Sequence, residues 1–214
     1  MFTRASRTGV VGLAVTAALM AGTAAEAGLL SANSGGAIGA FTGTQLFSND
    51  FGGFTVNASV DYAVFAPGAF GVAFPGQDPS NGSDYVYAYQ INNLPGTIPA
   101  ATAISQFTVG LDGDEPLGAT GFISDFGVTN PSSSSYIGSG PTSVAFDFAT
   151  PQIPFDGTSA LVFFTSAAAP ELDTATVHAA WADTHLLPSP SPEPATLGLL
   201  AMGLGLIGTR RRKA

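Results

Sequence analysis

The sequence predicts an all-β protein, a single antiparallel β-sandwich of immunoglobulin-like or jelly-roll type, with a targeting segment at each end. Three observations support this class. Apolar and polar residues alternate over several short stretches, which is the period of a half-buried strand. Glycine and proline, 27 and 15 of the 214 residues, recur between these stretches and interrupt helices. The body of the chain also has no apolar stripe with the 3.6-residue period of a helix.

Residues 1–27 are typical of a secretory signal peptide. Arg4 and Arg7 provide the positive start, and the apolar run Val10–Gly22 follows. Ala25 and Ala27 place small side chains at the positions that signal peptidase reads, so we expect cleavage before Gly28. A permanent N-terminal anchor is the alternative, but this run is short for a span of about 20 residues.

The body, residues 28–188, contains the predicted strands. The clearest is Phe54–Phe65, whose alternate residues share one face: Phe54, Val56, Ala58, Val60, Tyr62 and Val64. The next stretch, DYVYAYQIN, alternates in the same way and places four large side chains together: Tyr85, Tyr87, Tyr89 and Ile91. Further short β-branched and aromatic runs are AISQFTVGL, SVAFDFA, SALVFFTSA and the alanine-diluted TATVHAAW. These predict about eight strands.

Two stretches are predicted to lie outside the sheets. The run Asn130–Pro141 is rich in serine and glycine and indicates a polar loop. The run Leu187–Pro194 has proline at every second position, which favours an extended, polyproline-like linker.

The charge distribution excludes several classes of function. All six lysines and arginines lie in the two terminal segments, and 13 of the 15 acidic residues lie in the body. Such a body is expected to repel nucleic acid, whose binding depends on cations that neutralise phosphates. It cannot form a lysine Schiff base, and the chain has no cysteine for thiol chemistry or metal ligation.

The last segment, residues 189–214, ends in three parts: Pro192-Glu193-Pro194, the apolar run 195–209, and the cations Arg210, Arg211, Arg212 and Lys213. A helix over 195–209 would reach roughly 22 Å, short of a bilayer core of about 30 Å. It is therefore a marginal permanent anchor, suited to transient membrane insertion with its cations on the cytoplasmic side.

This three-part ending closely resembles the PEP-CTERM sorting domain. The resemblance implies an exported bacterial protein that a membrane-embedded exosortase recognises at Pro192, Glu193 and Pro194 and releases from its tail. The family is associated with exopolysaccharide and biofilm production, so exopolysaccharide is an implied partner. A simple C-terminal membrane anchor is the alternative.

Few motifs in the body indicate chemistry. Asp112, Asp114 and Glu115 form an acidic turn that could supply oxygen ligands to Ca²⁺, although a solvated turn explains the same residues. A metal site that joins His178, Asp183 and His185 is disfavoured, because the two histidines would face opposite sides of a strand. Trp181 suits a core position or a sugar-stacking one.

We therefore expect a non-enzymatic, exported protein of the cell surface or extracellular matrix, without a cofactor other than a possible Ca²⁺. One alternative is a carbohydrate-binding module, suggested by the aromatic strands. Another is a glycoside hydrolase that pairs carboxylates such as Asp112 and Asp147, and such an enzyme would need them within about 5–10 Å of each other.

Overall fold

The computed structural model describes residues 30, 34–51, 54–96, 103–113, 116–124 and 128–191. Within them the chain forms ten strands and one short helix, α2 (Phe70–Ala73). The strands are β1 (Ala37–Phe51), β2 (Phe54–Phe65), β3 (Tyr85–Leu94), β4 (Gln106–Gly110), β5 (Leu117–Ile123), β6 (Ser133–Ile137), β7 (Ser143–Asp147), β8 (Leu161–Ser166), β9 (Pro170–His178) and β10 (Ala182–Pro190). This all-β content confirms the predicted class.

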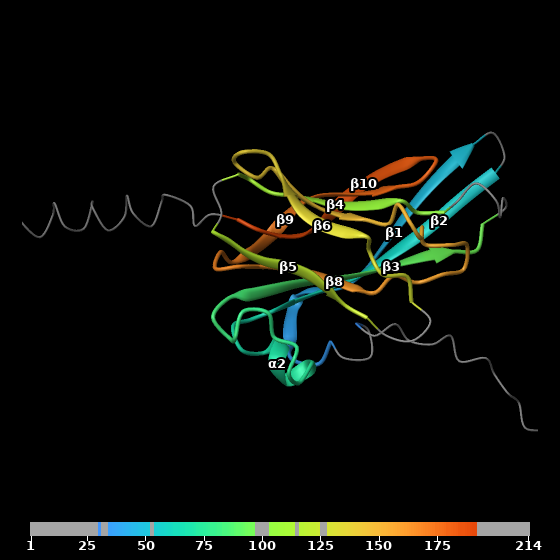
Figure 1. The fold of residues 1–214 in the computed structure, drawn as a ribbon. Coiled ribbons are helices and arrows are strands. Elements are labelled where there is room, and N and C mark those ends of the chain that lie inside the picture. Colours follow the sequence, from blue (N-terminus) through green and yellow to red (C-terminus); the bar gives the residue numbers. More distant parts are fainter. Residues whose placement is uncertain are drawn as a thin grey trace, which may run out of the picture.

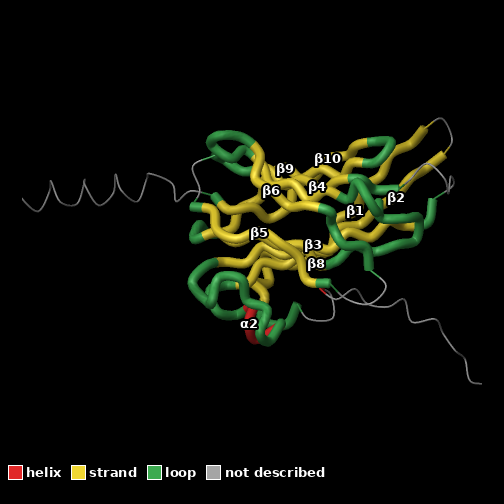
Figure 2. The backbone as a smooth tube through the Cα atoms, viewed as in Figure 1, coloured by secondary structure: helices red, strands yellow, loops and turns green. Residues whose placement is uncertain are grey.

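The strands form two five-stranded sheets that pack face to face (Figures 1 and 2). The first sheet has the order β1-β2-β3-β8-β5, and the second has the order β10-β9-β4-β7-β6. Every strand pair in both sheets is antiparallel. The predicted antiparallel sandwich is therefore present, with more strands than the sequence indicated.

The alternation predicted for β2 and β3 is the one that builds the core. Val56, Val60, Tyr87 and Tyr89 are buried between the sheets with their alternate neighbours. Aromatic rings from both sheets fill the space: Tyr87 stacks on Phe164 at 5.0 Å between centroids, and Tyr89 meets Phe107 across the sandwich at 5.4 Å. Such ring pairs add to the stabilisation that burial alone provides.

A second, smaller apolar cluster lies on the outer side of the first sheet, where α2 covers it (Figure 1). Its members include Phe65 from β2, Phe163 from β8 and Phe70 from α2. Leu30 is buried in the same cluster at 1% exposure, and its backbone N–H donates to Gln90 Oε1 at 3.0 Å. Because both of their faces are covered, β3 and β8 are buried along most of their length.

Two predictions about loops are wrong. Asn130–Pro141 contains β6, in which Ser134 and Tyr136 are half-buried while the alternate residues are exposed. Leu187–Pro190 continues β10 rather than starting a linker, and this strand runs two residues beyond the predicted end of the body. Proline is tolerated there because β10 lies at a sheet edge, where one side of the strand needs no backbone donors.

Candidate functional sites

The predicted processing sites lie outside the described residues. These are Ala25, Ala27 and Gly28 at one end, and Pro192 to Pro194 with Arg210 to Lys213 at the other. The described part of the chain nevertheless ends immediately before the C-terminal site, at Ser191. Ser191 follows β10 directly, and its backbone N–H donates to the Ala169 carbonyl at 3.0 Å. Pro192 is therefore joined to the sandwich without a spacer.

The acidic turn predicted to bind Ca²⁺ is described only in part, because Asp114 and Glu115 lie outside the described residues. Asp112 is exposed on the connection after β4, and the preceding residue, Leu111, donates its N–H to the Thr142 carbonyl at 3.0 Å. Within the described ranges, no three His, Asp or Glu side chains gather closely enough to hold a metal ion. The Ca²⁺ site stays a prediction.

The structure separates the two carboxylates that a glycoside hydrolase would need. Asp147 lies opposite Gln106 at the start of β4, whereas Asp112 lies beyond Gly110 at the other end of that strand. Six residues along a strand correspond to about 20 Å, roughly twice the largest separation known for such pairs. This geometry gives no support to Asp112 and Asp147 acting together.

The histidines and the tryptophan of the β9–β10 hairpin have separate environments. Trp181 is buried in the core cluster between the sheets, which agrees with a core role rather than sugar stacking. His185 faces inward, with its ring edge-on to Phe47 at 4.9 Å, while His178 lies on the outer face near Thr108. Partial burial lowers the pKa of His178 below 6.5. The two rings lie on opposite faces of the second sheet, but they belong to two paired strands, β9 and β10, and not to the single strand that the sequence argument assumed.

Asp183 joins the two sheets at one edge of the sandwich. Its Oδ2 accepts a hydrogen bond from the Ser48 N–H of β1 at 2.9 Å and lies 3.0 Å from His185 Nε2. Partial burial by itself would raise the pKa of Asp183. The hydrogen bonds from Ser48, His185 and Thr184 outweigh this effect and hold the pKa below the ordinary value of 3.8.

The outer face of the second sheet carries rows of hydroxyl groups that the sequence analysis missed. One row crosses all five strands through successive register partners, four of which carry a hydroxyl and one of which is an alanine: Ser135, Ala145, Thr108, Thr176 and Thr184. The hydroxyls of Thr176 and Thr184 lie 2.9 Å apart. The signal was present as alternate threonines in TATVH, but the row appears only when the strand register is known.

A second polar row lies beside the first, through Ser133, Asp147, Gln106 and His178. Gln106 Nε2 donates to Asp147 Oδ1 at 2.5 Å, and Ser133 Oγ donates to Oδ2 at 3.0 Å. These bonds hold the carboxylate in place across three strands. The face as a whole offers hydroxyl, amide, carboxylate and imidazole groups on a sheet surface.

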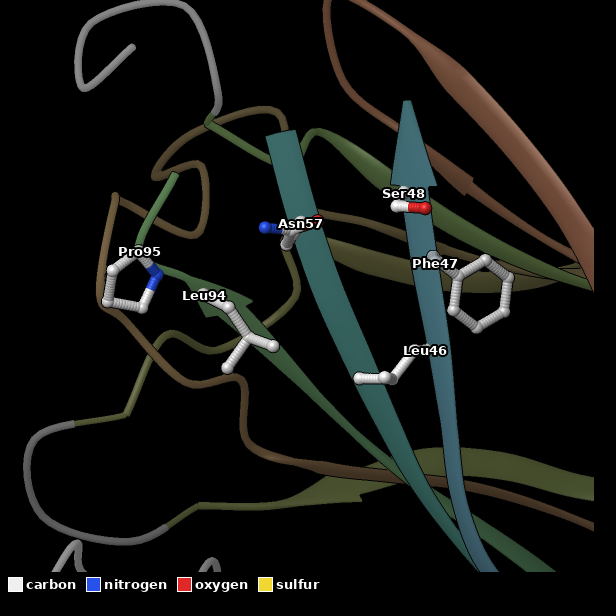
Figure 3. A pocket seen from close by; sticks show the side chains of 6 residues that line it. All are labelled: Leu46, Phe47, Ser48, Asn57, Leu94 and Pro95. Carbon is white, nitrogen blue, oxygen red and sulfur yellow. The ribbon is translucent and has the colours of Figure 1, made fainter. Parts of the chain in front are cut away.

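A cleft of about 440 Å³ lies on the other sheet and was also missed. It is lined by residues of β1, β2 and the end of β3: Leu46, Phe47, Ser48, Asn57, Leu94 and Pro95 (Figure 3). Leu46 extends on the opposite side of β1 from the Phe47 ring and is 62% exposed. The cleft is therefore mostly apolar and extends from the edge strand β1 across β2 to the end of β3.

The comparison with protein families identifies the C-terminal segment. A family model described as the PEP-CTERM protein-sorting motif matches residues 192–213. The chain carries a PEP-CTERM sorting motif. This motif marks an exported protein that exosortase processes and that is sorted to the cell surface or beyond it. No curated protein and no solved structure matches the chain.

The match begins at Pro192 and includes Glu193, Pro194 and the four cations of the tail. It starts one residue after the last described residue, so the PEP-CTERM motif and the sandwich are contiguous. In the described part of the chain, no helical segment has the length and apolar character needed to cross a bilayer.

Proposed function

We propose that the sandwich is a non-enzymatic component of the cell surface or of an exopolysaccharide-rich extracellular matrix, delivered there by its sorting motif. This proposal rests on one observation: the sorting motif follows the last strand of the sandwich almost directly. β10 ends at Pro190 and the motif begins at Pro192, so processing at Pro-Glu-Pro releases every strand of the sandwich intact. The delivered cargo is then the folded body itself.

The character of the body supports the same proposal. Its 13 acidic residues face no lysine or arginine between residues 28 and 188, which keeps the surface strongly hydrated. Aromatic rings occupy the space between the sheets, where an enzyme of this architecture could otherwise hold a substrate. The outer surfaces are therefore the parts through which the body meets a partner.

Delivery is tested by fractionating cells that express the full chain. We expect the normal protein in the surface or matrix fraction, with the tail absent from its mass. Glu193→Ala alters the recognised motif and deletion of residues 210–213 removes the orienting charge, so both precursors should stay in the membrane fraction. Glu171→Ala, at an exposed position of β9, is the matched control and should be sorted normally. Normal release of both tail variants would refute processing by exosortase.

The matrix role needs a separate test, because a protein can be exported without acting there. Cells that lack the chain should form a matrix with altered mechanical strength or retention of polysaccharide, and the normal gene should restore it. Extracts of the matrix are then treated with the purified exported protein and the glycan products are measured. Release of shorter glycans would contradict a non-enzymatic role, and an unchanged matrix in the deletion strain would contradict a matrix role.

A carbohydrate-binding module is the second candidate, and the hydroxyl row of the second sheet favours it. Thr108, Thr176 and Thr184 lie side by side and could exchange hydrogen bonds with sugar hydroxyls along an extended chain. Replacing Thr108 and Thr176 by valine preserves the shape and removes the hydroxyls. We expect this variant to lose retention on purified exopolysaccharide, while Thr150→Val on an exposed loop does not. Equal retention of both variants would remove this candidate.

A further inference from the structure

The four strands at the sheet edges differ in how they are protected from pairing with another chain. Edge strands are usually blocked by short length, proline, lysine or an irregular register. β6 has only five residues, β10 contains Pro188 and Pro190, and β5 has a register shift between Leu117 and Thr120. In addition, the Tyr136 hydroxyl donates to the Gly118 carbonyl of β5 at 3.2 Å. The edges formed by β5, β6 and β10 are therefore protected against pairing with a strand of another chain.

β1 is the exception. It has 15 residues and contains no proline, lysine or arginine. Its own register shift, between Ala37 and Thr42, leaves a regular register with β2 from Thr42 to Phe51. Asp50 is the one charged residue in the strand, so the stretch before it is neutral on an otherwise acidic body. The nearest carboxylates flank this stretch: Asp61 of β2 accepts a hydrogen bond from the Thr44 hydroxyl at 2.6 Å, and Asp183 of β10 accepts one from the Ser48 N–H at 2.9 Å.

The backbone of β1 offers a set of hydrogen-bonding groups that face away from β2. Ser48 directs its N–H to Asp183 of β10, so residues of the same parity, Thr44 and Leu46, also direct theirs away from β2. By this parity the N–H groups of Thr44 and Leu46 are not donors to β2, while the Leu46 carbonyl accepts a hydrogen bond from Gln45 Nε2 at 2.9 Å. Leu46 is also the exposed side chain beside the apolar cleft.

We propose that the free edge of β1, from Thr44 to Ser48, pairs antiparallel with the same edge of a second copy of this chain. A two-fold axis at Leu46 places Leu46 opposite its equivalent and Thr44 opposite Ser48, because a two-fold contact uses the same patch on both copies. The two Leu46 side chains then shield each other next to their clefts. Asp183 limits the pairing, since it occupies the Ser48 N–H that the second copy needs.

The chain offers a direct test because it contains no cysteine, so any disulfide must form through an introduced one. Hydrogen-bonded residues that face each other across antiparallel strands have Cα atoms about 5.5 Å apart, within the range for a disulfide. The exported Leu46→Cys protein is treated with copper phenanthroline, the oxidant that accepts the two electrons from the paired thiols. Leu186→Cys is the matched control, because Leu186 is 58% exposed, against 62% for Leu46, and lies on the other sheet.

We expect Leu46→Cys to form disulfide-linked dimers at least about tenfold faster than Leu186→Cys at micromolar protein, because pairing holds the two thiols at an effective concentration near millimolar. Adding Asp183→Ala should increase the dimer fraction about tenfold further, the equivalent of the two backbone hydrogen bonds it frees. Adding Thr44→Pro removes an edge donor and should return the rate to that of the control. Asp173→Ala, elsewhere on the same hairpin, should change nothing.

Three results would overturn the proposal. The first is equal cross-linking of Leu46→Cys and Leu186→Cys. The second is cross-linking of Leu46→Cys that Thr44→Pro leaves unchanged, since a strand pair cannot form without its donors. The third is a disulfide to a different surface protein in cells, without homodimer. Thermal unfolding of each variant, measured in parallel, ensures that the proteins compared are folded. The outcome is independent of the proposed matrix role.

Discussion

Replacing Leu30 by alanine tests whether the segment just after the predicted signal cleavage site is part of the folded body. Leu30 lies three residues after Ala27, is 1% exposed, and packs in the outer cluster with Phe65, Phe70 and Phe163. The substitution leaves the backbone hydrogen bond to Gln90 in place, because the donor is the Leu30 N–H. The change therefore isolates the packing of one side chain.

The expected magnitude follows from burial. Truncating a fully buried leucine to alanine costs about 2–5 kcal/mol, with the largest values in cavities that cannot close. The four-residue helix α2 belongs to the same cluster, and we expect so short an element to close part of the cavity, which gives a loss of about 3 kcal/mol in the free energy of unfolding. For a domain of this size, that loss lowers Tm by about 6–12 °C.

The measurement is urea unfolding of the exported protein, followed by tryptophan fluorescence and circular dichroism, together with calorimetry. Leu172→Ala is the control, because Leu172 is 56% exposed on β9 and its truncation should change stability by less than about 0.5 kcal/mol. If Leu30→Ala costs less than Leu172→Ala or about the same, Leu30 does not hold the outer cluster. Cleavage by signal peptidase after Leu30 would also leave stability unchanged, because the exported protein would then lack residue 30. N-terminal sequencing shows whether residue 30 is present.

Three further predictions concern titration. The pKa of Asp183 is lowered in the folded protein, so its contribution to stability is present above about pH 4, the pKa in the unfolded chain, and is lost as pH falls through the folded pKa. Asp183→Asn should therefore reduce the fall of Tm in acid, and an unchanged fall would contradict this role of Asp183. The pKa of His178 is lowered in the folded protein, so as pH falls the unfolded chain binds this proton first and the fold loses stability below pH 6.5. NMR titration of the His178 ring should give a lower pKa in the folded protein than in the urea-unfolded protein. Burial raises the pKa of Tyr136 to about 12. In an ultraviolet titration, Tyr136→Phe should therefore remove one tyrosine that ionises near pH 12, whereas removal of a tyrosine that ionises near pH 10 would refute this assignment.

The alternation in β2 and β3 was readable in the sequence because it depends on local chemistry. A strand places successive side chains on opposite faces, so valines and tyrosines at every second position indicate a buried face whatever the strand pairs with. The sorting motif was readable for a different reason. It is a short linear segment that another protein recognises, so its meaning does not depend on how the rest of the chain folds.

Other features depended on tertiary contacts. The serine-rich β6 has little strand signal of its own, and it forms because it pairs with β7 and lays Tyr136 against the core. β10 accepts Pro188 and Pro190 because its position at a sheet edge requires no backbone N–H donor on one side of the strand. The sequence does not state which strand lies at an edge. The hydroxyl row and the hydrogen bond between Ser48 and Asp183 likewise join distant residues, in the second case 135 positions apart in the chain. The free edge of β1 is defined only by the order of the strands in the sheet. The sequence by itself determined the strand periodicity and the destination of the protein, whereas strand order and register, which are properties of long-range pairing, decided which surfaces it presents there.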